Sequence, residues 1–133
     1  MKILLLGATG QVGHALAWKL SQAGHQLTIM VRKAAGQQLP EGATILERDE
    51  FTAESFGSAL RGMDQVIYGI GLPEQFLFDD SVFEKVNCGM LRTFLGALQS
   101  SDVRRLTYIS TYEVFKEIDG AIDETTRSPT KAR

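Results

Sequence analysis

Acidic residues are missing from the first forty positions of this 133-residue chain, although the same stretch carries four basic side chains. The formal net charge of the whole chain is only −2, so its N-terminal end is locally positive. A local positive charge suits a phosphorylated ligand. Nucleic acid is disfavoured as a partner, because the pI is about 5.7 and no basic stripe with interleaved aromatic residues is present.

The residues needed for metal or disulfide chemistry are also scarce. Cys88 is the only cysteine, which excludes an internal disulfide and a metal centre ligated by a cluster of cysteines. The two histidines, His14 and His25, have no metal-ligating neighbours in the sequence. We therefore expect no metal site.

Long hydrophobic runs are absent as well. No stretch approaches the length of a membrane span, and Lys2 followed by four apolar residues is too short for a signal peptide. We expect no membrane association and a cytoplasmic location. With 44% hydrophobic residues and no linker or repeat, the 133 residues predict one domain with a single core.

Strand-like and helix-like segments alternate along the chain, which favours an α/β fold with a parallel sheet. The apolar run Ile3–Leu6 predicts a first strand that is buried on both faces. Further strands are predicted at Gln26–Val31, Thr44–Glu47, Gln65–Tyr68 and Arg105–Ile109, and helices at Gln11–Ala23, Ala53–Leu60 and about Ser81–Leu98. The predicted architecture is a doubly wound parallel sheet of Rossmann type with five strands in the order 3-2-1-4-5.

A glycine-rich segment separates the first predicted strand from the first predicted helix. Its glycines let the backbone turn tightly and approach a phosphate without an intervening Cβ, and the free amides that begin the helix stabilise an anion. The glycine spacing departs from the generic dinucleotide-binding fingerprint, so the prediction depends as much on the flanking strand and helix as on the glycines. The segment predicts a dinucleotide pyrophosphate site, with a turn that binds no ligand as the alternative; its residues are Gly7, Ala8, Thr9, Gly10, Gln11, Val12 and Gly13.

The residues after the second predicted strand bear on the choice of dinucleotide. A site selective for NAD usually offers a carboxylate to the ribose about 20 residues beyond the glycines, and none is available here. Arg32 stands in that place, where its guanidinium can grip a 2′-phosphate, with Lys33 beside it. We expect NADP in preference to NAD. The alternative is that both residues are a solvated loop pair.

In these motifs the chain resembles the extended and atypical short-chain dehydrogenases/reductases, which include NAD(P)-dependent epimerases, dehydratases and dihydroflavonol-type reductases. The resemblance runs over essentially the whole chain. It implies that Asp49, after the third strand, meets the adenine and that the loop Gly69-Ile70-Gly71 passes the cofactor ribose. It also implies that Asn87 occupies the family's helix-asparagine position.

The resemblance further implies a substrate site after the fifth strand. There Thr111 would hold the substrate's oxygen, with Ser110 beside it. Tyr112 and Lys116 have the spacing of the family's tyrosine–lysine acid/base pair, but only two residues separate Tyr112 from the strand. The alternative for this pair is a packed loop aromatic and a solvated lysine. Glu113 is a further candidate for proton transfer.

Taken together, the resemblance implies that residues 1–133 are the NAD(P)-binding domain of an epimerase, dehydratase or reductase. Such an enzyme transfers a hydride between nicotinamide and a carbon bearing a hydroxyl or carbonyl, for example in a nucleotide sugar. The family's tyrosine–lysine helix would come after Arg133, so we expect a truncated chain that is inactive alone. The alternative is a non-catalytic NADP(H)-binding sensor. The apolar breadth of the segment 81–98 leaves a homodimer open.

Overall fold

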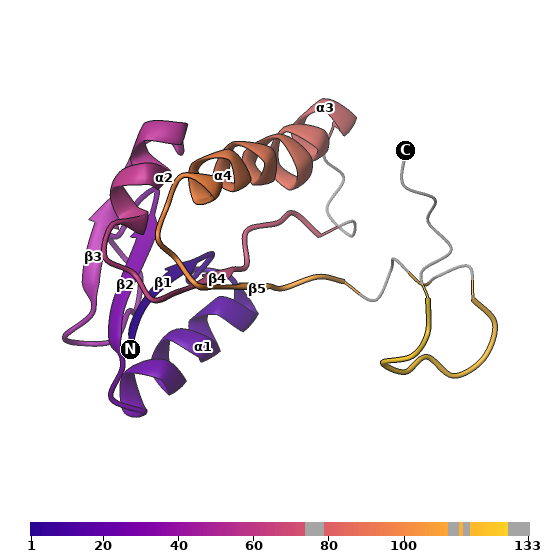
Figure 1. Cartoon of the computed structure of the whole chain (residues 1–133), viewed down its shortest axis with the longest axis horizontal. Coiled ribbons are helices and arrows are strands. Elements are labelled where there is room, and N and C mark those ends of the chain that lie inside the picture. The colour runs from indigo at the N-terminus through magenta and orange to yellow at the C-terminus, as the bar shows by residue number, and fades with distance from the viewer. Residues whose placement is uncertain (74–78, 112–114, 116–117, 128–133) are drawn as a thin grey trace.

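The chain folds into a parallel sheet with helices on both of its faces (Figure 1). The computed structural model describes residues 1–73, 79–111, 115 and 118–127. Within them the sheet has five strands in the order β3-β2-β1-β4-β5, and every neighbouring pair is parallel. This arrangement confirms the predicted α/β fold and strand order. The strands are β1 (Lys2–Leu6), β2 (Gln26–Val31), β3 (Thr44–Glu47), β4 (Gln65–Tyr68) and β5 (Arg105–Tyr108).

Helices cover the two faces unequally. In Figure 1, α2 and α4 lie on one side of the sheet and α1 lies on the other. None of the helices in the described part of the chain is long and apolar enough to cross a lipid bilayer. The helical elements are α1 (Gln11–Gln22), α2 (Ala53–Leu60), α3 (Asp80–Glu84), the π-helical turn η1 (Lys85–Gly89) and α4 (Met90–Gln99).

The long helix predicted over about Ser81–Leu98 forms, but it contains a π turn. α3, η1 and α4 follow one another without a break from Asp80 to Gln99. A π turn closes its hydrogen bonds over five residues instead of four, so it rotates the helix faces that lie beyond it. Apolar residues continue on both sides of η1, and hydrophobic periodicity alone therefore did not reveal the turn.

The first strand shows why both faces of the sheet are covered. Ile3 and Leu5 belong to a core beneath α1, whereas Leu4 and Leu6 belong to a second core beneath α2 and α4. Successive side chains of a strand point to opposite faces, so a continuous apolar run needs a helix on each side. All four side chains are at most 1% exposed. The strand is therefore buried on both faces, as its sequence predicts.

Aromatic rings fill the core beneath α2 and α4. The ring of Phe94 is fully buried, and its centroid lies 5.4 Å from that of Phe56 and 4.9 Å from that of Tyr68. Burial, together with the nearby Tyr108, raises the pKa of the Tyr68 phenol. The Tyr68 hydroxyl has no hydrogen-bond partner among the described residues. Tyr68 thus stays protonated and acts mainly as a packed ring.

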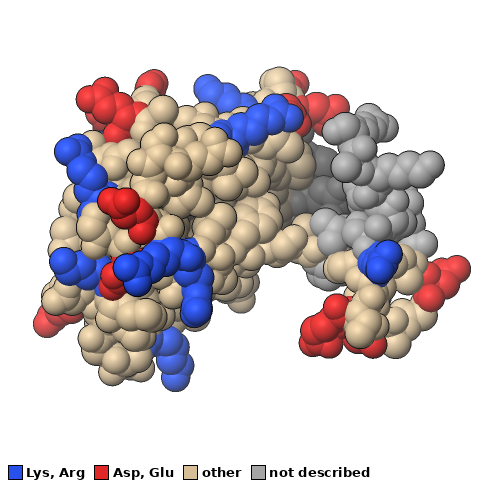
Figure 2. Space-filling view, viewed as in Figure 1, with Lys and Arg blue, Asp and Glu red and all other residues tan. Residues whose placement is uncertain are grey.

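Charged side chains of both signs mark the surface. On the face shown in Figure 2, basic side chains are interspersed with acidic ones around an uncharged central area. This face therefore carries charges of both signs. On it, attraction of an anionic ligand would depend on individual side chains and backbone amides.

Truncating Phe94 should destabilise the domain strongly. Phe94→Ala removes the contacts with two rings and leaves a cavity, so we expect the free energy of unfolding to fall by about 3–5 kcal/mol. The adjacent Leu95 is 37% exposed and provides a matched control, for which Leu95→Ala should cost less than about 1 kcal/mol. Urea unfolding followed by circular dichroism measures both changes. Similar losses for the two variants would contradict the packing of α4 described above.

Candidate functional site

The turn between β1 and α1 packs directly on the end of β4. Gly7 has a φ of +88°, a conformation that side-chain-bearing residues rarely adopt, and a Cβ there would overlap the carbonyl of Gly69. A Cβ on Gly13, in the first turn of α1, would overlap the carbonyl of Gly7. These two glycines are therefore required by the fold itself, because they let three backbone segments come together.

Gly10 is a different case. Apart from its two chain neighbours, a Cβ there would have one neighbour within 4 Å among the described residues, the carbonyl oxygen of Gly7 at 3.4 Å. Gly10 is the N-cap of α1, where no side chain caps the helix and no acidic residue lies in the first turn. The amides that begin α1 therefore lack side-chain acceptors, and the positive end of the helix dipole faces outward. A phosphate placed beside Gly10 would be stabilised without any charged side chain.

Two adjoining cavities open on this turn. One has a volume of about 440 Å³ and the other about 770 Å³. They share Gly7, Gly10 and the loop Gly69–Leu72, which follows β4. The site thus lies where β1 and β4 end, at the carboxyl edge of the sheet, where ligands bind in open α/β folds.

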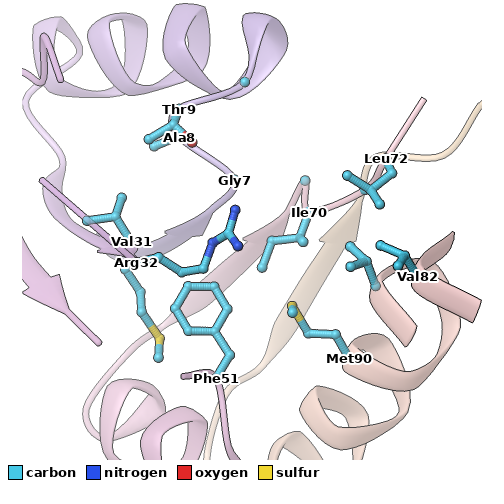
Figure 3. Close-up of a pocket in the computed structure, with 15 residues that line it drawn as sticks. Gly7, Ala8, Thr9, Val31, Arg32, Phe51, Ile70, Leu72, Val82 and Met90 are labelled. Carbon is cyan, nitrogen blue, oxygen red and sulfur yellow. The ribbon is translucent and has the colours of Figure 1, made fainter. Parts of the chain in front are cut away.

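The first, smaller cavity lies toward β2. Its walls are the segments Gly7–Gly10 and Met30–Arg32, the loop Gly69–Leu72, Phe51, and side chains from α3 to α4. Figure 3 shows the guanidinium of Arg32 reaching into this cavity from the end of β2, close to the ring of Phe51. Arg32 makes no hydrogen bond or ion pair with any residue that the structure describes, so its five donors are available to a ligand.

A carboxylate on the neighbouring strand steadies the loop that carries Arg32. Glu47, at the end of β3, pairs in register with Val31. Its carboxylate accepts a 2.8 Å hydrogen bond from the backbone N–H of Ala34. Lys33 and Asp49 are both exposed and line neither cavity. The cofactor contacts predicted for these two residues stay predictions.

The second cavity lies toward β5. It is lined by the start of α1 (Gln11–Gly13), by Phe83 and Asn87, and by the end of β5 with the segment that follows (Tyr108–Thr111). The fold thus brings the predicted hydroxyl residues Ser110 and Thr111 to the same cavity as the glycine segment and the loop after β4. No charged side chain lines the described part of this cavity. Tyr112, Glu113 and Lys116 lie outside the described residues.

Asn87 fixes the loop that separates the two cavities. Its side-chain oxygen accepts a 2.7 Å hydrogen bond from the backbone N–H of Leu72, and its Nδ2 donates to the Leu72 carbonyl at 3.1 Å. The carboxamide of Asn87 therefore pairs with both backbone groups of Leu72, as the backbone of a neighbouring β-strand would. The residue sits in the π turn η1, and such turns are frequent at functional sites.

Several residues that line the cavities were not predicted from the sequence. They are mostly apolar, and apolar residues in helices and loops are usually assigned to the core. One signal was available for Phe51, because it follows the end of β3 by four positions and the ends of parallel strands share one edge of the sheet. The unpredicted lining residues with large side chains include Met30, Phe51, Val82, Phe83, Val86, Met90 and Tyr108.

Metal binding finds no support in the described residues. Among them, no group of three or more His, Cys, Asp and Glu side chains could hold a metal ion. The donor groups of the site are instead backbone amides, hydroxyls, the carboxamides of Gln11 and Asn87, and one guanidinium. This set of donors suits phosphate and neutral oxygen, both of which accept hydrogen bonds.

Replacing Gly10 should separate ligand binding from folding. Gly10→Val places side-chain atoms where the cavities open but meets little of the protein, so the variant should fold while binding of NADPH falls by at least about tenfold. Gly57→Val is a matched control, because Gly57 lies in α2 with open space around it. Intrinsic cofactor fluorescence measures binding, and circular dichroism measures folding. If folded Gly10→Val bound NADPH as tightly as folded Gly57→Val, Gly10 would have no part in the phosphate site.

Loss of the Asn87 side chain should loosen the loop. Asn87→Ala leaves the N–H and the C=O of Leu72 without partners in a half-buried position, so we expect a loss of about 1–3 kcal/mol in unfolding free energy. Gln65→Ala is the control, since it removes one exposed hydrogen bond to Thr107. Urea titration of both variants gives the comparison. The same small loss for each would show that the paired bond to Leu72 contributes little.

Known proteins resemble this chain in sequence. The family model described as NAD(P)H-binding matches residues 7–132. A malate dehydrogenase from Erwinia tasmaniensis is 29% identical over an alignment of 121 residues, and the match covers 86% of this chain and 39% of that protein. Short-chain dehydrogenase/reductase family 42E member 1 from Macaca fascicularis is 27% identical over 118 residues, 84% of this chain and 30% of that protein.

A solved structure shows the same fold. It is a variant of UDP-glucuronic acid 4-epimerase from Bacillus cereus in complex with UDP-4-deoxy-4-fluoro-glucuronic acid and NAD, with a TM-score of 0.78 and 19% identity over 96% of this chain and 46% of that one. This chain therefore spans less than half the length of each of the three proteins. Because the family model covers nearly all of its residues, and because a short-chain dehydrogenase/reductase is among its relatives, the chain belongs to the NAD(P)H-binding family, as its motifs predicted.

Proposed function

We propose that this chain is the NADP-binding domain of an oxidoreductase of the epimerase, dehydratase or reductase kind. Binding of NAD(P) is the property of the family. The preference for NADP is supported by one observation above all. The guanidinium of Arg32 reaches into the cavity beside the glycine turn, and no described side chain pairs with it.

The geometry supports a division of the dinucleotide between the two cavities. The pyrophosphate would lie at the start of α1, where Gly10 leaves space and the first amides of the helix point outward. Arg32 would hold the 2′-phosphate through paired hydrogen bonds. Glu47 is a weak competitor for the ribose hydroxyls, because its carboxylate is already bonded to the amide of Ala34. The nicotinamide half would extend into the second cavity.

The second cavity would provide the chemical environment for the substrate. When bound, the cofactor supplies hydride transfer to or from a carbon that bears oxygen. The hydroxyls of Ser110 and Thr111 would hydrogen-bond that oxygen and orient the carbon. No charged side chain lines the described part of the cavity, which suits an uncharged hydroxyl or carbonyl group at the reacting position.

We further propose a nucleotide sugar, or another small hydroxyl or carbonyl compound, as the substrate class. The support is the similarity in fold to a 4-epimerase solved with a UDP-linked sugar. A cytoplasmic location, a homodimer and the inactivity of these 133 residues alone remain predictions from the sequence.

Removing the Arg32 guanidinium tests the preference for NADP. Arg32→Ala should weaken NADPH by roughly ten- to a hundredfold, since a charge-assisted paired contact is lost, and should leave NADH almost unchanged. Lys19→Ala is the control, because Lys19 is an exposed cation in the last turn of α1 and lines neither cavity. Fluorescence titration of both cofactors gives the four affinities. Equal weakening of NADPH and NADH would show that Arg32 supports the structure and does not recognise the 2′-phosphate.

A further inference from the structure

Most of the side chains that line the smaller cavity are apolar. Thr9 and Arg32 contribute the only polar side chains among its described lining residues. Its apolar walls come from the end of β2, from Phe51 and Ile70, and from the α3–α4 helix through Val82 and Met90. An apolar cavity of about 440 Å³ next to a free guanidinium suits a flat, uncharged ring that carries a phosphate on its sugar.

The ring of Phe51 is held in place from behind. Phe51 is half-buried, and its ring centroid lies 5.6 Å from that of Phe56 at an interplanar angle of 52°. Phe56 is fully buried and makes an edge-to-face contact with Phe94. Because the core fixes one side of the ring, Phe51 would lose little conformational freedom on contact with a ligand. Figure 3 shows the ring projecting into the cavity below the guanidinium of Arg32.

Side chains that could read the edge of a base are scarce at this place. No carboxylate or amide side chain is among the described residues that line the cavity. Asp49, two positions before Phe51, is exposed and does not line it. An aromatic ring can bind a base through its face alone, and such stacking depends little on which base is bound.

We propose that Phe51 is the base-stacking residue of this domain: the adenine ring of NADP(H) lies against the Phe51 ring and is held by stacking, without a bond from the Asp49 carboxylate. The inference rests on the proposed function, because it places the base of the cofactor in the first cavity. It makes Phe51 a determinant of affinity for the adenosine half. It also implies that the hypoxanthine analogue of NADPH binds within about threefold of NADPH itself.

The test uses adenosine 2′,5′-bisphosphate, which carries the base and the 2′-phosphate but no nicotinamide. Calorimetric titration of the whole chain should show that Phe51→Ala weakens this probe by roughly tenfold and that Phe51→Trp keeps wild-type affinity. Asp49→Asn should leave the affinity unchanged. Phe83→Ala is the matched aromatic control, because Phe83 is also half-buried but lines only the second cavity.

Folding and the cofactor claim are checked in the same experiment. Phe51→Leu keeps the apolar packing against Phe56 and should still lose several-fold in affinity, so a fold defect in Phe51→Ala does not hide the result. The inference would be overturned if the folded Phe51→Leu and Phe51→Ala variants bound the bisphosphate with wild-type affinity. It would also be overturned if Asp49→Asn were the one variant with weaker binding. If the wild-type chain binds neither NADPH nor the bisphosphate, the proposed function itself fails.

Discussion

The contact of backbone on backbone between Gly7, Gly13 and Gly69 is the constraint on which the site depends. Any side chain at Gly7 would meet the end of β4, and any side chain at Gly13 would meet the turn itself. The start of α1 is therefore held against the carboxyl ends of β1 and β4. Both cavities share Gly7, Gly10 and the loop Gly69–Leu72, and the start of α1 lines the second cavity together with that loop. A wider junction would separate the phosphate-binding amides from the rest of the site.

The two halves of the site are shaped by one helical stretch. From α3 to α4, Val82 and Met90 face the first cavity, while Phe83 and Asn87 face the second. The separating loop is tied to this stretch through the paired hydrogen bonds between Asn87 and Leu72. The apolar first half and the hydroxyl-bearing second half match the different chemistry of the two ends of a dinucleotide.

Much of this arrangement was predictable, because local patterns and the rules of parallel sheets act together. The strands from Gln26 to Tyr68 have the predicted bounds, and the glycine turn and Arg32 line the cavities. The place of Phe51 in the wall of the first cavity was not predictable from periodicity, since a phenylalanine near a helix start more often belongs to the core. The bonds of Asn87 depend on a contact across fifteen residues, which spacing does not encode. Nor did any pattern distinguish Lys33 and Asp49, which stand apart from both cavities, from residues that line them.

The π turn has a consequence for how this family member can change over time. Its hydrogen bonds join residues five positions apart, which sets how α3 is rotated about the helix axis relative to α4. Asn87 lies inside this turn. Deleting one residue other than Asn87 between Lys85 and Gly89 would restore an ordinary helix and rotate α3 relative to α4 by about 100°. Such a deletion would move the Asn87 amide away from Leu72, so the length of this stretch is coupled to the shape of the site.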